Sequence, residues 1–117
     1  MGGSQTVTAL RSVFMTPAEI RVRLLLSAQR ALLAQVAASL RCVTCEWRDT
    51  HVQVQFIFDG EISDEDRDDV HAIGAEIIAD FPAPWTISED LLRVDYPADT
   101  RPVALSLYVY QRKELTP

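Results

Sequence analysis

Residues 59–80 read DGEISDEDRDDVHAIGAEIIAD, an acidic turn that leads into an amphipathic pattern. The first eleven of these residues hold seven carboxylates, against the single cation of Arg67. Ser63, with Asp66 three residues later, is typical of a helix start, and we predict a helix over about residues 64–80. The apolar residues that keep helical spacing are Val70, Ile73, Ile77, Ile78 and Phe81. The helix should therefore bury one face and keep its acidic start in water.

An earlier stretch predicts another amphipathic helix. The tetrapeptide Thr16-Pro17-Ala18-Glu19 has the form of a capping box with proline at the first helical position. Apolar residues then recur at steps of four, and the series is Ile20, Leu24, Ala28, Leu32, Val36 and Leu40. Most of the nearby cations lie off this stripe, namely Arg21, Arg23 and Arg30. We therefore predict a core helix that runs to about Ser39 and has a basic outer surface.

Four stretches predict strands. Residues 42–48 and 52–58 alternate with period two, and the short link Asp49-Thr50-His51 between them favours an antiparallel hairpin. A less regular strand is expected over Thr86–Tyr96, and a cleanly alternating one over residues 103–110. In the third strand the expected inward residues are Ile87, Leu92 and Val94, with a bulge near Glu89 and Asp90.

The element order is therefore α-β-β-α-β-β, which predicts an α+β fold. Two helices with single apolar faces are both covered by one face of a four-stranded, mainly antiparallel sheet, which gives a two-layer sandwich. The other sheet face would then be left to water. Its residues would include Thr44, Glu46, Gln53, Gln55, Ile57, Ser106, Tyr108 and Tyr110. We expect a flexible leader or cloning remnant over residues 1–14, one domain over residues 15–114 and a frayed tail over residues 115–117.

Charge is distributed unevenly along the 117 residues. Residues 1–48 hold six arginines and two acids, residues 49–99 hold fourteen acids and two arginines, and residues 100–117 hold three cations and one glutamate. So acidic a middle repels nucleic-acid phosphates and attracts a basic partner. No uninterrupted apolar run is long enough to span a membrane, and the start lacks the form of a secretory signal. We therefore expect a cytoplasmic protein that binds neither nucleic acid nor membrane.

Catalytic and metal-binding signatures are sparse. The Cys42-Val43-Thr44-Cys45 pair lies in a predicted strand, where positions three apart point to opposite faces, so we interpret both cysteines as packing residues. His51 and His71 have no Cys, Ser or Asp arranged beside them in the pattern of a catalytic triad. No phosphate-binding loop or nucleophile elbow is present. We therefore predict a non-catalytic protein with no metal and no cofactor.

The acidic cluster has two interpretations that the sequence leaves open. Carboxylates in the first turn of a helix are stabilised by its unpaired amides and dipole, which accounts for Asp64, Glu65 and Asp66. Four more like charges exceed what a cap requires, and these are Asp59, Glu61, Asp68 and Asp69. The cluster is either a solvated face or a surface that meets a partner.

Four segments carry a resemblance to a known class of proteins. They are MTPAEIR at residues 15–21, FIFDGEISDEDR at 56–67, IIADFP at 77–82 and YVYQRK at 108–113. With the α-β-β-α-β-β order, the chain resembles small bacterial immunity proteins of contact-dependent inhibition and related polymorphic toxin systems, over about residues 15–114. The resemblance implies a cytoplasmic protein that binds a cognate toxin domain and blocks it, without catalysis of its own.

On this hypothesis the partner is a protein toxin with a basic active-site groove. The expected contacts are Asp59, Glu61, Asp64, Glu65, Asp66, Asp68 and Asp69, with Trp85 as an aromatic anchor. Two alternatives stay open. One is a self-associating structural protein, for example a homodimer, which would use the open sheet face or an edge strand. The other is a small ligand-binding domain with a pocket near Pro82–Pro84 or Pro97–Pro102 and carboxylates of raised pKa inside it.

Overall fold

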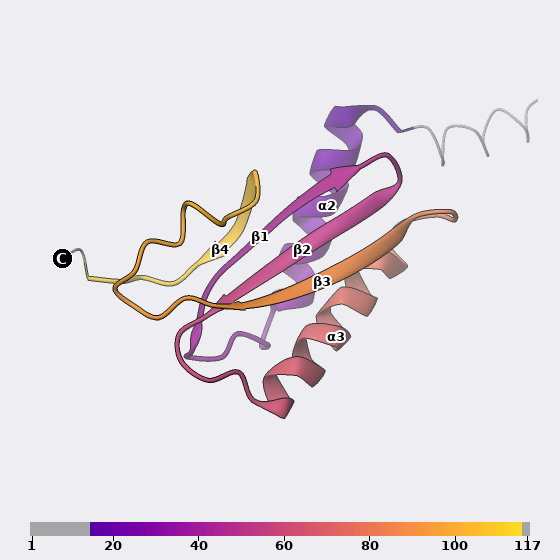
Figure 1. Cartoon of the computed structure of the whole chain (residues 1–117). Helices are drawn as coiled ribbons and strands as arrows, with labels where there is room; N and C mark the ends of the chain where they lie inside the picture. Colours follow the sequence, from indigo (N-terminus) through magenta and orange to yellow (C-terminus); the bar gives the residue numbers. More distant parts are fainter. Residues whose placement is uncertain (1–14, 116–117) are drawn as a thin grey trace, which may run out of the picture.

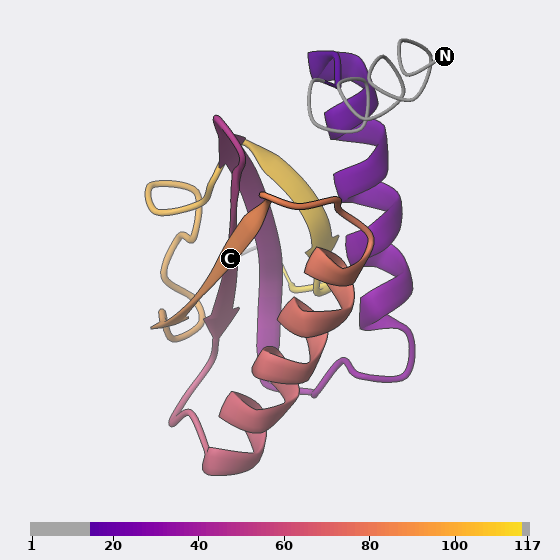
Figure 2. The same ribbon diagram turned by 90° about the vertical axis from the view of Figure 1, so that its right-hand side faces the viewer.

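Two helices lie on one face of a four-stranded sheet in the computed structural model, which describes residues 15–115 (Figures 1 and 2). The elements are α2 (Pro17–Leu32), β1 (Leu40–Arg48), β2 (His51–Phe58), α3 (Asp64–Ala79), β3 (Thr86–Arg93) and β4 (Leu107–Gln111). Their order and layering confirm the predicted α+β sandwich. The expected leader over residues 1–14 and the end of the expected tail lie outside the described residues.

The sheet has the strand order β3-β2-β1-β4. β1 and β2 form the predicted antiparallel hairpin, with Arg48 opposite His51 beside the turn, and β4 pairs antiparallel with the other side of β1. β3 instead runs parallel to β2. A parallel pair needs a crossover connection, and α3 supplies it by returning the chain to the end of the sheet where β2 begins. The sheet is therefore mixed, with two antiparallel pairs and one parallel pair.

Both predicted helix starts are confirmed. The Thr16 hydroxyl accepts a hydrogen bond from the Glu19 amide at 3.2 Å, and proline occupies the first turn of α2. At α3, the Ser63 hydroxyl accepts from the Asp66 amide and the Asp66 carboxylate accepts from the Ser63 amide, each at 3.0 Å. These reciprocal bonds satisfy amides that have no partner inside the helix. Local sequence therefore fixes where each helix begins.

The end of α2 comes earlier than predicted. The helix stops at Leu32, and Ala34 adopts a left-handed backbone with a φ of 62° that turns the chain toward the sheet. Val36 is consequently 41% exposed, while Leu40 reaches the core from β1. The prediction of helix to Ser39 is wrong because the step of four continues across a turn and into a strand.

β3 has no bulge, contrary to the prediction. It pairs with β2 without a register shift from Thr86 to Arg93, so its residues alternate strictly. Ile87 and Leu91 pack against the core, whereas Leu92 pairs with Ile57 and points to the other face. Glu89 lies beneath α3 at Gly74, where an added Cβ would collide with the Glu89 carboxylate. The expected inward position of Leu92 is therefore wrong.

The second sheet face is partly covered, not left to water. Thr44, Gln55 and Ile57 are buried there, because the segment of residues 94–106 folds over them on the side opposite the helices (Figure 2). This segment is free to do so because β4 begins only at Leu107. The other residues expected on this face divide into Ser106 and Tyr108, which are exposed, Glu46 and Gln53, which are half-buried, and Tyr110, which packs against the core on the helix side.

Two buried polar side chains attach the covering segment to the sheet. The Thr44 hydroxyl donates to Gln55 Oε1 at 2.9 Å and accepts from the Leu105 amide at 3.0 Å. Gln55 Nε2 in turn donates to the Val103 carbonyl at 2.8 Å. Each polar group buried here has a partner, which is the condition under which polar burial does not destabilise a fold. Thr44 and Gln55 therefore hold the segment of residues 94–106 against the hairpin.

Replacing Thr44 by its isostere valine should weaken this attachment. Thr44→Val keeps the volume but leaves the Leu105 amide and the side-chain oxygen Oε1 of Gln55 without their buried partner. The unfolding free energy should therefore fall by about 2 kcal/mol. Denaturant unfolding measures the loss. Thr50→Val is the matched control, since the half-buried Thr50 side chain makes no hydrogen bond within residues 15–115. An equal loss of unfolding free energy in both variants would show that the Thr44 hydrogen bonds do not hold the segment in place.

Candidate partner-binding surface

The acidic segment lies where β2 ends and α3 begins, at one end of the helical layer (Figure 1). Here the term acidic segment means residues 59–69. The side chains of Glu61, Asp64, Glu65 and Asp68 are exposed, and those of Asp59, Asp66 and Asp69 are half-buried. The predicted cluster is thus a surface feature, but its seven members do not have the same surroundings.

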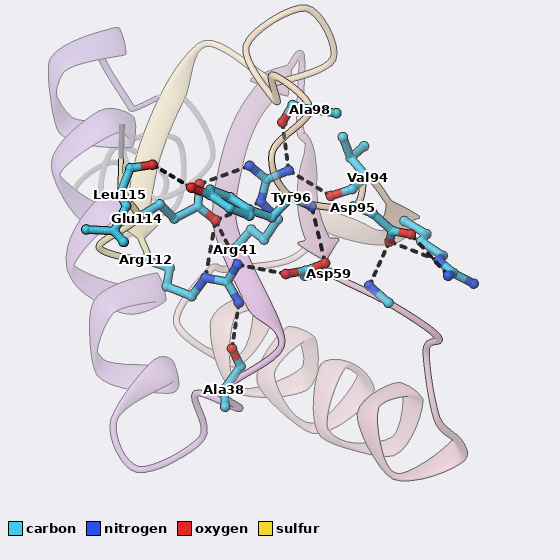
Figure 3. Close-up of polar contacts among 12 residues, drawn as sticks. Ala38, Arg41, Asp59, Val94, Asp95, Tyr96, Ala98, Arg112, Glu114 and Leu115 are labelled. Carbon is cyan, nitrogen blue, oxygen red and sulfur yellow. Dashed lines mark hydrogen bonds and ion pairs between the residues drawn. The ribbon is translucent and has the colours of Figure 1, made fainter. Parts of the chain in front are cut away.

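Asp59 and Asp66 are engaged in internal contacts. Asp59 Oδ2 accepts from Arg112 Nη2 at 3.0 Å, and Asp59 Oδ1 accepts from the Tyr96 amide at 3.2 Å (Figure 3). Asp66 is the acceptor in the capping box of α3. Both carboxylates therefore fix the shape of the acidic segment, and neither is free to meet a partner with both oxygens.

The other five carboxylates of the segment are open to contact. Within residues 15–115 no ion pair joins any of Glu61, Asp64, Glu65, Asp68 and Asp69 to an arginine, lysine or histidine. The nearby Arg93 pairs with Asp95 at 3.0 Å, and the Gly60 amide donates to the same carboxylate at 2.7 Å. A free negative patch therefore remains at the start of α3.

The acidic segment is attached to the body of the protein by two arginines (Figure 3). Arg41, on β1, is only 4% exposed; its Nε and Nη2 donate to the two Glu114 oxygens at 2.8 and 2.9 Å, and its Nη1 donates to the Val94 and Ala98 carbonyls. Arg112 joins Glu114 to Asp59 and also donates to the Ala38 carbonyl at 2.9 Å. The hydrogen bond from Arg41, followed by that from Arg112, holds the pKa of Glu114 below its usual range.

Trp85 does not offer an exposed anchor. It is 7% exposed and packs against Phe81, with ring centroids 5.0 Å apart. Its indole N–H is buried and has no hydrogen-bond partner among the described residues. Because Trp85 follows Pro82-Ala83-Pro84, its sequence context resembled a surface loop, whereas the structure places it in the core.

Exposed apolar side chains instead gather along α2 and the turn after it. Val22, Leu26, Leu33 and Val36 are 57%, 61%, 72% and 41% exposed. Beside the first two, a hollow of about 680 Å³ is lined also by Arg23, Arg30 and Asp80. Asp80 pairs with Arg30 and accepts from Ser27 at 2.6 Å, so its pKa is lowered, mainly by Ser27. The apolar spacing places Val36 in the core stripe, and so it does not predict that this residue is exposed.

A sequence model of MafI2 immunity proteins matches residues 21–114. The chain belongs to the MafI2 immunity protein family. The match covers α2 from its second turn onward, the whole sheet, the acidic segment and Glu114. It confirms the predicted resemblance to small immunity proteins of polymorphic toxin systems. No curated protein matches the chain.

The two cysteines and the hollow near Pro97 are two other places in this MafI2 protein that the sequence analysis considered for chemistry or ligand binding. Cys42 and Cys45 are unpaired, buried and on opposite sheet faces, as strand geometry predicts, and burial raises both thiol pKa values, that of Cys45 to about 12. The hollow near Pro97 contains Asp99 and Glu114, whose pKa values are lowered by Arg101 and Arg41. The ligand-binding alternative called for carboxylates of raised pKa, and these two have the opposite shift.

No helix within residues 15–115 combines the length and the apolar character that crossing a bilayer requires.

Glu114 should make the stability of this MafI2 protein depend on acid. Because its folded pKa lies below the usual 4.5, its contribution is complete above that pH and is lost as the pH falls through the folded value. Glu114→Gln should lower the unfolding free energy by about 2 kcal/mol at neutral pH and flatten the acid limb. Denaturant titrations followed by tryptophan fluorescence at several pH values measure both effects.

The control for this experiment is Glu76→Gln, on the exposed side of α3. Some acid dependence should survive in the Glu114 variant, since Asp80, Asp95 and Asp99 also have lowered pKa values. An acid limb as steep as that of the unmodified protein would contradict the assignment of Glu114.

Proposed function

We propose that this protein neutralises a cognate bacterial toxin domain by binding it, without catalysis, through the acidic segment. The observation that carries the proposal is the set of five carboxylates of the acidic segment that make no ion pair within residues 15–115. Membership of the MafI2 immunity protein family supports a protein toxin as the partner. A toxin that acts on nucleic acid needs a basic groove for its substrate, and an anionic surface of matching size can occupy that groove.

The geometry of the segment suits this role because it is preorganised. The first residue of the segment, Asp59, is paired with Arg112, and the Gly60 amide donates to Asp95. The capping box fixes the first turn of α3. The free carboxylates therefore need little ordering when a partner arrives, which reduces the entropic cost of binding. The dipole of α3 favours negative charge at the start of this helix, which is where the carboxylates lie.

The proposal predicts a rate effect. Asp64→Asn, Glu65→Gln, Asp68→Asn and Asp69→Asn together should slow association with the purified toxin domain at least about tenfold at low salt, and should flatten the dependence of the rate on ionic strength. Asp66 is left in place because it caps α3. Surface plasmon resonance at several salt concentrations measures the association rate, and thermal unfolding checks the fold.

A matched control removes four negative charges elsewhere on the surface. Glu46→Gln, Asp49→Asn, Glu76→Gln and Asp99→Asn change the net charge by the same amount while keeping the acidic segment. This variant should keep most of the association rate, because a local field falls off within about 10 Å at moderate salt. If both variants slow association equally, net charge is responsible, and the proposed role of the segment is refuted.

A further inference from the structure

Leu33 and Val36 are apolar side chains that the fold leaves in water. They lie in the turn of residues 33–39 between α2 and β1 and are 72% and 41% exposed. Neither belongs to the hydrophobic core, nor to the apolar side chains that pack on its edge. Two apolar side chains exposed within four residues of one turn make it a candidate interaction surface.

The turn is joined directly to the acidic segment. The Asp59 amide donates to the Ser39 carbonyl at 2.8 Å, and Arg112, which pairs with Asp59, donates to the Ala38 carbonyl. In both views the turn after α2 and the start of α3 lie at the same end of the helical layer (Figures 1 and 2). The turn that carries the exposed apolar pair is therefore braced against the first residue of the acidic segment, and both lie at one end of the molecule.

Charge at this end of the molecule is predominantly negative. Arg112 is neutralised by Asp59 and Glu114, and farther up α2 the Arg30 cation is paired with Asp80. Of the acidic segment, Glu61, Asp64, Glu65 and Asp68 are exposed to solvent, against one exposed cation, Arg67. A matching partner face would have apolar side chains at its centre and lysines or arginines beside them.

We infer that Leu33 and Val36 form the apolar anchor of the toxin contact, and that the toxin presents apolar side chains bordered by cations to this turn. The inference rests on the proposed function, which supplies the partner, and it gives the anchoring role to these two residues in place of the buried Trp85. Charges at the start of α3 mainly set the rate of encounter, while desolvation of the apolar pair sets the lifetime of the complex.

A second copy of this chain fits the surface less well. A two-fold contact uses the same patch on both subunits, so two acidic segments would be brought to one interface. Like charges brought together in this way oppose association. A basic partner has no such penalty, which is why the toxin is the occupant that charge complementarity favours.

The test is a neutral substitution of both anchor residues. Leu33→Gln with Val36→Gln should raise the Kd for the purified cognate toxin domain about 30-fold or more, mainly through faster dissociation. The control is Val103→Gln with Leu115→Gln, a valine and a leucine that are 42% and 84% exposed and that belong neither to the turn of residues 33–39 nor to the acidic segment. The control pair should leave the Kd within about twofold of the unmodified protein.

The outcomes separate this inference from the proposed function. Toxin binding that is unchanged by the Leu33 and Val36 substitutions, or a dimer in sedimentation that they dissolve without altering toxin affinity, overturns the anchor but leaves the proposed function standing. Absence of any toxin binding by the unmodified protein refutes both. Circular dichroism and the single variant Leu33→Gln distinguish a lost contact from a damaged fold, because one exposed leucine contributes little to folding.

Discussion

The guanidinium of Arg41 is the group on which the arrangement of this protein depends. It lies almost entirely out of solvent and meets Glu114 through two parallel bonds, while its remaining donors reach the Val94 and Ala98 carbonyls. One side chain of β1 thus holds the segment after β3 and the segment after β4. Charge-assisted, two-pronged contacts of this kind fix geometry as well as adding stability. Glu114 then passes the connection to Arg112 and so to Asp59.

This chain of contacts explains why the acidic segment has a defined shape. A loop that carries so many like charges would spread apart if its ends were loose. Asp59 helps to prevent this spreading, because its ion pair with Arg112 fixes the first residue of the segment. The next residue, Gly60, donates its amide hydrogen to Asp95. Two of the seven carboxylates are used to position the other five. The division between structural and free acids is invisible in a count of charges.

Local signals in the sequence predicted the beginnings of elements well. Thr16 with Pro17, and Ser63 with Asp66, act within four residues, so their effect does not depend on the rest of the fold. The hairpin of β1 and β2 was predictable for the same reason, since alternation and a short link are both local. The α+β class follows from these elements because their apolar faces can be buried together in few ways.

The errors arose where distant contacts decide the outcome. The step of four in α2 continues through Val36 to Leu40, and only the position of the sheet shows that the helix must stop at Leu32. β3 keeps its alternation because β2 lies beside it without a register shift, which two acids in its middle did not indicate. The candidate surface was mispredicted for the same reason: Trp85, expected as an exposed anchor, lies in the core, and Val36, expected in the core, is exposed.

Arg41 and the Glu114 carboxylate that it binds are far apart in the sequence, and this affects the motions of the native state. The two residues are 73 positions apart along the chain, so detachment of the C-terminal strand would leave an uncompensated cation next to apolar strands. Opening at this edge therefore costs more free energy than the loss of the β4 backbone hydrogen bonds alone. The amides of β4 and of the adjoining part of β1 should accordingly exchange with solvent together.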